Sequence, residues 1–324
     1  MTALWTEIMN PAELTAFSRV ALDSLDDGTT LTSILPNVYQ EEVKFSWRVG
    51  EMLNGEAEFG EFDTEAPIAN HGPGEEKTIR LLPVSQKRRL SEYQQLTNPE
   101  AVQRLAEDRA DAVVRSIITR LNRARAEALV TGGLKLNENG IAQTVEFGRK
   151  AAQTDAKPGT VWSGASADPI ADLRKWADMV ADVSGYTPDT MLVSTRIATI
   201  LGTKIAKAGY ITGGGQIVGR EAVNDVLASQ GLPMMTVYDG RANGKRFIED
   251  DRVILAAAGQ VGGTVFAPTV ESQDPRFNLG EGQRSGIVAG LYRADDPPMG
   301  WVLGKAIALP ILANPNASLS AKVL

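Results

Sequence analysis

The residues best suited to specific chemistry are charged, and they gather in two neighbouring blocks of opposite sign. Residues 51–76 contain eight acidic residues and no lysine or arginine, whereas residues 77–89 contain five basic residues and no acid. Blocks of opposite charge attract two surfaces and fix their register. A solvated, disordered loop explains the same composition equally well. The first explanation predicts contacts between copies of the chain through Glu56, Glu58, Glu61, Asp63, Glu65, Lys77, Arg80, Lys87, Arg88 and Arg89.

Groups for covalent or metal chemistry are scarce. His71 is the only histidine and there is no cysteine, which excludes disulfides and thiol nucleophiles and argues against a Ser-His-Asp triad or a zinc site. The run Glu249, Asp250 and Asp251 is better explained as a solvated turn than as a metal cluster, because consecutive side chains on a turn point apart. We therefore expect no catalytic residue, no cofactor and no metal.

A glycine-rich loop spans residues 209–219 and contains Gly213, Gly214 and Gly215. Such loops can hold a phosphate, but this one follows an expected helix and lacks both the G-x-G-x-x-G pattern and a G-K-[ST] ending. We interpret it as a mobile loop that lines a symmetry axis, with a nucleotide site as the lesser alternative.

The composition limits the class of protein further. The 324 residues include 33 basic and 40 acidic ones, so the net charge of −7 disfavours direct wrapping of nucleic acid. The N-terminal residues lack the pattern of a signal peptide, and no apolar run approaches the roughly 20 residues of a membrane span. We expect a soluble chain with a large core.

One long helix is predicted over residues 99–131. Asn98 and Pro99 are suited to the cap and the first helical position, and Gly132 and Gly133 end the pattern. Apolar residues recur between them at helical spacing. At 1.5 Å per residue this helix is roughly 50 Å long, so we expect it to lie along a sheet.

The remaining pattern predicts an α+β fold. We expect a short helix from Pro11, an extended arm over 30–38, strands over 43–49 and 78–84, and a hairpin over 134–147 with its turn at Asn139-Gly140. A compact α/β unit follows over about 160–268, with helices from Pro169, over 195–208 and over 220–230, and strands over 190–193, 233–238 and 252–255. Later strands complete the first sheet, so this unit is an insertion in a discontinuous domain.

The order of these elements resembles the HK97-type fold of tailed-phage major capsid proteins, and within it the lambda-like phage major capsid protein E family. Each supporting motif is weak alone, but their order and spacing match across nearly the whole chain. The motifs are LTSILPNV at 31–38, VEFGR at 145–149, GTVWS at 159–163, DP at 168–169, RFIEDDRVIL at 246–255 and ALPILANP at 308–315.

The resemblance implies an N-terminal arm (1–40), an extension loop (41–94), a peripheral domain (95–158 and 270–324) containing the spine helix, and an axial domain (159–269). It also implies hexamers and pentamers that close into an icosahedral shell around double-stranded DNA, from a procapsid that matures by expansion. A separate scaffolding protein, a portal and a decoration protein are implied as partners, with assembly in the host cytoplasm and no membrane. It transfers no catalytic residue.

Two other functions remain open from the sequence. One is a cellular nanocompartment shell of the same fold, similar to encapsulins. The other is an α/β enzyme that binds a ligand at the loop from Gly213 to Gly219.

Overall fold

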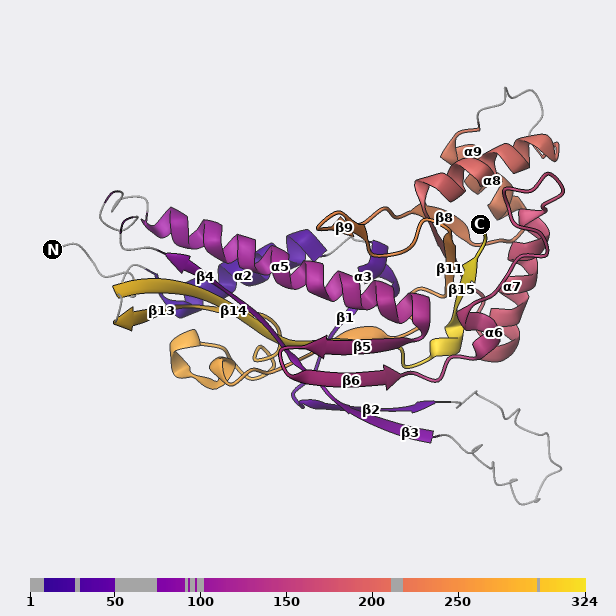
Figure 1. The fold of residues 1–324 in the computed structure, drawn as a ribbon. Coiled ribbons are helices and arrows are strands. Elements are labelled where there is room, and N and C mark those ends of the chain that lie inside the picture. Colours follow the sequence, from indigo (N-terminus) through magenta and orange to yellow (C-terminus); the bar gives the residue numbers. More distant parts are fainter. Residues whose placement is uncertain are drawn as a thin grey trace, which may run out of the picture.

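The computed structural model describes residues 9–26, 30–49, 75–90, 93, 97, 102–210, 218–295 and 298–324. Figure 1 shows an elongated molecule in which a long helix lies along one sheet, while a second sheet with its helices stands at one end. The predicted mixture of helices and sheets in two units is confirmed.

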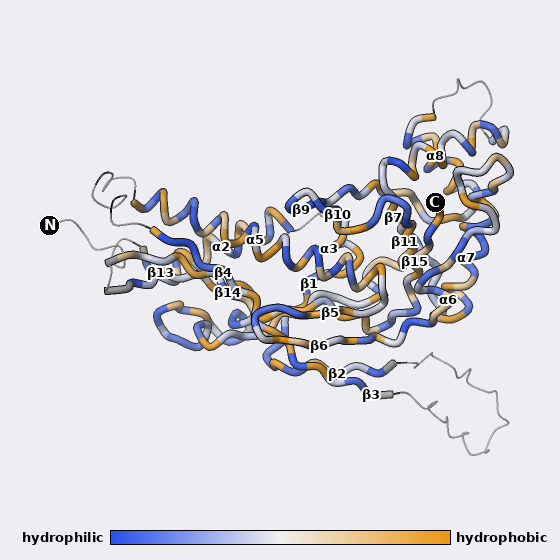
Figure 2. The backbone as a smooth tube through the Cα atoms, in the orientation of Figure 1, coloured by the Kyte–Doolittle hydropathy of each residue, from blue (hydrophilic) through white to orange (hydrophobic). Residues whose placement is uncertain are grey.

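The long helix is α5, Val102–Thr131, and its end is the one predicted. The predicted start, residues 98–101, lies outside the described residues. Hydrophobic and hydrophilic residues alternate along α5 (Figure 2), and its buried side chains include Val113, Ile117 and Leu121. Gly132 ends the helix with a φ of +69°, which a residue without a side chain adopts readily, and its N–H donates to the carbonyl of Ala128 at 2.8 Å.

The sheet beneath α5 is built around β14, Pro298–Ile311. It pairs antiparallel with β13 (Val288–Asp295), with β12 (Gly263–Ala267) and with β4 (Pro83–Leu90), and β1 (Asn37–Tyr39) adds to β12 in parallel. A side chain at Gly304 would place its Cβ 2.5 Å from Val113 of α5. The helix therefore lies directly on the backbone of the central strand.

The N-terminal segment covers one side of α5. Helix α2, Pro11–Asp26, begins where predicted and packs against α5 and β13. The extended arm expected from residue 30 is wrong in its first half, because Thr30–Ile34 forms the short helix α3. One helical turn buries Leu31 and Ile34 together in the core, whereas an extended strand would not bring residues three apart to the same face.

Two hairpins lie on the side of the molecule opposite the N-terminal segment. Strand β5 (Gly133–Glu138) pairs with β6 (Ile141–Glu146), and the predicted turn is confirmed by positive φ angles of 47° at Asn139 and 80° at Gly140. Strand β2 (Lys44–Val49) pairs with β3 (Glu75–Arg80). Figure 1 shows this second hairpin pointing away from the body.

The second unit has a four-stranded sheet in the order β15, β11, β7, β8, formed by Ser318–Lys322, Arg252–Ala256, Thr190–Val193 and Met234–Val237. Helices α7 (Pro169–Ser184), α8 (Thr195–Lys207) and α9 (Arg220–Ser229) pack on it. Helix α7 begins where predicted, and α8 and α9 begin and end within a residue of their predicted bounds. Asp168 caps α7 by accepting from the N–H groups of Ile170 and Ala171, both at 3.1 Å. Shorter elements are α6 (Ala151–Thr154), β9 (Arg241–Ala242), β10 (Lys245–Arg246) and three 3₁₀ turns, Glu271–Gln273, Pro275–Phe277 and Pro315–Ala317.

Strand pairing crosses the expected segment boundaries at four places, the first being β1 of the N-terminal arm (1–40), which pairs with β12. β12, within 159–269, and β4, within 41–94, both lie in the large sheet under α5. β15, within 270–324, lies in the small sheet, where it pairs with β11. Strands so far apart in sequence pair because they pack against the same sheet edge in the folded chain. Local sequence patterns do not show which strands will pair in this way.

Candidate functional site

The predicted contact residues fall into two groups. Glu56, Glu58, Glu61, Asp63 and Glu65 lie outside the described residues, as do His71 and Gly213, Gly214 and Gly215. The five basic residues are described, but they do not share one strand. Lys77 and Arg80 lie on β3, whereas Lys87, Arg88 and Arg89 lie on β4. The strand predicted over 78–84 is therefore interrupted between Arg80 and Pro83, where the chain passes from the hairpin into the large sheet.

Lys77 fixes the base of the β2–β3 hairpin. Its ammonium donates to the carbonyl of Glu146 on β6 at 3.2 Å, which joins the two hairpins. Opposite Lys77, the indole of Trp47 is buried against Phe147 with ring centroids 6.0 Å apart. The hairpin thus leaves the body from a packed, hydrogen-bonded base.

The basic residues of β4 point to both faces of the sheet. Arg88 lies opposite Val302, which is buried under α5, so Arg88 is on the helix side and is half-buried. Lys87 and Arg89 alternate with it and are exposed on the other face. The ammonium of Lys87 lies 4.9 Å from the ring centre of Trp301, a cation–π contact. Among the described residues, no ion pair joins Lys87 or Arg89 to an acid.

A buried ion pair joins the N-terminal segment to α5. The Nη1 and Nη2 atoms of Arg125 donate to the two carboxylate oxygens of Asp26 at 2.6 and 2.9 Å, and both side chains are about 99% buried or more. Arg125 also donates to Thr264 on β12 and to Asn37 on β1, both at 2.7 Å. Burial raises the pKa of Asp26, but hydrogen bonds and charge from Arg125 outweigh it and leave that pKa below its usual value.

A second buried arginine binds the last turn of α5, close to Arg125 along the helix. Arg149 ends the VEFGR motif, and its Nη1 and Nη2 atoms donate to the carbonyls of Leu129 and Val130 at 2.6 and 2.7 Å. These carbonyls lie at the negative end of the helix dipole, where a cation is favoured. Burial, and less so the charge of Arg252, lowers the pKa of Arg149 to about 10.

The acidic turn at Glu249 gives no metal site in the described part of the chain. Glu249 pairs with Arg252 at 2.9 Å, Asp250 with Arg196 at 3.4 Å and Asp251 with Lys322 at 3.0 Å. Three different cations thus draw the three carboxylates apart, and no group of three or more ligand side chains is found among the residues described. Within those same residues, no helix is long and apolar enough to cross a membrane.

The sequence singled out the charges at 77–89 but missed both buried arginines. Arg125 carried a detectable signal, since it sits between Ala124 and Ala126 on the apolar side of the helix pattern. For Arg149 the only signal was its position in the VEFGR motif, and that motif did not indicate a role for the side chain.

Comparison with known proteins gives a consistent result. The model of a family described as phage major capsid protein E matches residues 79–323. A solved structure assigned to the capsid of an Escherichia coli CFT073 prophage is similar, with a TM-score of 0.66, 16% identity and coverage of 98% of this chain and 99% of that one. A phage-related protein from Bordetella bronchiseptica RB50 has a TM-score of 0.60, 12% identity and 95% coverage of each chain. The capsid of Myoviridae phage XM1 has a TM-score of 0.50 and 12% identity, and the match covers 91% of this chain and 92% of that one. No curated protein sequence matched.

Proposed function

The chain belongs to the phage major capsid protein E family, and from this premise we propose that its copies tile the shell of a tailed double-stranded DNA phage as hexamers and pentamers. Its fold is the HK97-type capsid fold, which its structural neighbours share over nearly their full length. The observation that supports the function best is the family match over residues 79–323, because it covers α5, the whole small sheet and every strand of the large sheet except β1. The protein acts as a component of the virion.

The domain assignment follows from this function. We infer that the β2–β3 hairpin is the base of the extension loop, and that the sheet under α5 is the peripheral domain. The small sheet with α7, α8 and α9 is the axial domain, whose loop with Gly213, Gly214 and Gly215 lies at the capsomer axis. Assembly takes place in the host cytoplasm with a separate scaffolding protein and a portal, and a decoration protein binds the finished shell. The chain has no catalytic role.

The charged blocks form the contact between neighbours in this proposal. Lys87 and Arg89 lie exposed on the sheet face away from α5, with no acid from the described residues paired to them. The acidic block of residues 51–76 provides complementary charge from the next copy. Arg88 is excluded from this contact because it faces α5.

Assembly of the purified protein tests the function. Expressed with its scaffold, it is expected to form particles or capsomers of megadalton mass in electron micrographs and by light scattering. A stable monomer at high concentration under those conditions would count against a shell subunit.

Charge reversal tests the contact. We expect Lys87→Glu with Arg89→Glu to raise the concentration needed for assembly by at least about tenfold, or about 1.4 kcal/mol, while the melting temperature changes by less than about 2 °C. Lys87→Arg with Arg89→Lys keeps both charges and serves as the matched control. An equal loss of assembly and of thermal stability would place these residues in the fold of the subunit instead.

A further inference from the structure

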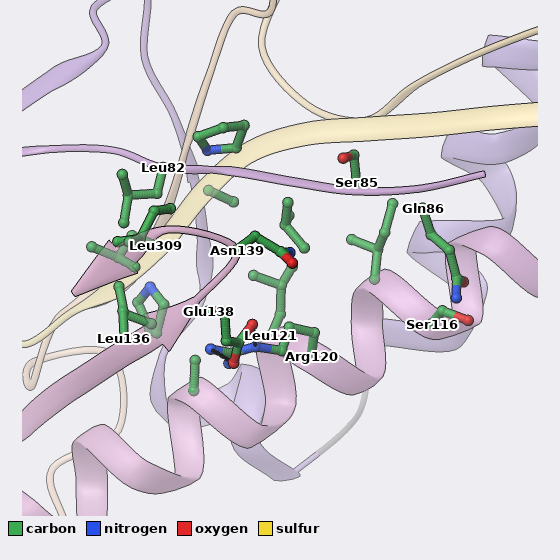
Figure 3. Close-up of a pocket in the computed structure, with 17 residues that line it drawn as sticks. Leu82, Ser85, Gln86, Ser116, Arg120, Leu121, Leu136, Glu138, Asn139 and Leu309 are labelled. Carbon is green, nitrogen blue, oxygen red and sulfur yellow. Dashed lines mark hydrogen bonds and ion pairs between the residues drawn. The ribbon is translucent and has the colours of Figure 1, made fainter. Parts of the chain in front are cut away.

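A pocket of about 290 Å³ lies where α5, β4, β14 and the tip of the β5–β6 hairpin meet. Figure 3 shows its lining side chains converging from these four segments. The volume is about twice that of an engineered apolar cavity that binds benzene, and it approaches the lower limit of natural ligand pockets. The space therefore suits a molecule with one or two rings.

The pocket has an apolar end and a polar end. Leu82, Leu136 and Leu309 gather at one end in Figure 3, whereas Gln86 and Ser116 lie at the other. An apolar ring placed among the leucines would leave water, and a polar group on the same molecule would reach the opposite end. The lining thus suits a ligand with an apolar ring at one end and a polar group at the other.

The charges in the pocket balance each other. Arg120 lies beside Glu138, with Nη2 2.9 Å from Oε1 and Nε 3.2 Å from Oε2. An ionic ligand would lose its hydration without meeting a net opposite charge. The oxygens of Glu138, Gln86 and Asn139 can still accept a hydrogen bond from an uncharged donor.

From this geometry we propose that the pocket is a binding site for a flat, uncharged molecule with an apolar ring and one hydrogen-bond donor. The site uses residues of β4 other than Lys87 and Arg89. A bound molecule would touch the hairpin, the helix and the sheet together, so it would hold these three elements in one arrangement. Because it binds the folded chain, it also raises the melting temperature.

The probe for this site is 6-fluoroindole, which combines a flat apolar body with one N–H donor. Fluorine NMR of the probe, titrated with the full chain, is expected to show saturable broadening with half-saturation below about 1 mM. Ser116→Phe fills the polar end and is expected to weaken binding by at least about tenfold. The same readout works on subunits and on particles, so it does not depend on assembly.

Thr119→Phe is the matched control. Thr119 lies on the same helix, and its hydroxyl donates to the carbonyl four residues earlier at 2.7 Å, as that of Ser116 does at 2.9 Å. Thr119 does not line the pocket, so this variant should bind the probe within about twofold of the parent. If Ser116→Phe fails to fold, Ile141→Trp fills the pocket from the hairpin side.

Three results would overturn the proposal. The first is the absence of saturable binding to the parent chain. The second is equal weakening by Ser116→Phe and Thr119→Phe. The third is loss of binding when subunits enter particles, which would mean that a neighbouring copy fills the pocket.

Discussion

Two arginines are buried along α5 in different ways. Arg125 meets a carboxylate, since Asp26 accepts hydrogen bonds from both of its Nη atoms, and it contacts four elements, α2, α3, β1 and β12. Arg149 meets carbonyl and hydroxyl oxygens, and its positive charge is compensated by the end of the helix. The comparison teaches that a buried cation needs either an opposite charge or an aligned set of dipoles. The first solution joins the N-terminal segment to α5, and the second joins α5 to the segment that follows β6.

The largest effect is expected from Arg125→Met. This variant leaves the carboxylate of Asp26 buried without a cation, which costs about 3–5 kcal/mol of the free energy of unfolding. Urea denaturation of unassembled subunits measures the loss. The double variant Asp26→Leu with Arg125→Met removes both charges and should recover most of it. If the double variant is as unstable as the single one, packing rather than charge causes the loss.

Arg149→Met is expected to have a smaller effect, of about 1–3 kcal/mol. It removes the hydrogen-bond donors to the carbonyls of Leu129 and Val130, but it leaves no unpaired charge in the core. The same urea measurement applies. Arg149→Lys retains the charge without the planar pair of donors and should restore part of the loss. A cost above that of Arg125→Met would contradict the comparison.

Comparing alanine variants of two glycines measures the steric effect of the Arg149 side chain. Gly132 and Gly140 both have positive φ, so alanine at either position costs about 1–2 kcal/mol in backbone strain. At Gly132 the new Cβ would also lie 3.0 Å from the Arg149 side chain, whereas at Gly140 nothing lies within 4 Å. Gly132→Ala should therefore be the more destabilising by up to about 1 kcal/mol. Equal losses in thermal unfolding would show that Arg149 moves aside freely.

The smallest expected effect is on how steeply the stability of the folded chain falls at acid pH. The pKa of Asp26 is lower in the folded chain than in the unfolded chain, so the unfolded state binds more protons as the pH falls below about 4. The contribution of Asp26 is complete above that pH and is lost as the pH falls through its folded pKa. The Asp26→Leu, Arg125→Met double variant should thus lose stability less steeply with acid than the parent. Arg149→Met should keep the parent's slope, and identical slopes for all three proteins would refute this assignment.

Local signals predicted the elements but not their partners. Gly132 ends α5 and Asn139-Gly140 turns the hairpin, because each acts through its own backbone conformation. The place of Arg125 between Ala124 and Ala126 indicated burial but not its partner, because Asp26 lies 99 residues earlier. Likewise, β4 ends up beside β14 more than 200 residues later, so Lys87 and Arg89 leave the hairpin on which the charge pattern had placed them.

The last strand, β15, has a consequence for synthesis on the ribosome. It pairs with β11 along Arg252 to Ala256, so the small sheet lacks its edge until residues 318–322 are made. At about 5–20 residues per second, the 62 residues from 256 to 318 take about 3–12 s. During that interval the small sheet of the nascent chain is unfinished, which delays its association with sister chains that emerge from neighbouring ribosomes on the same message.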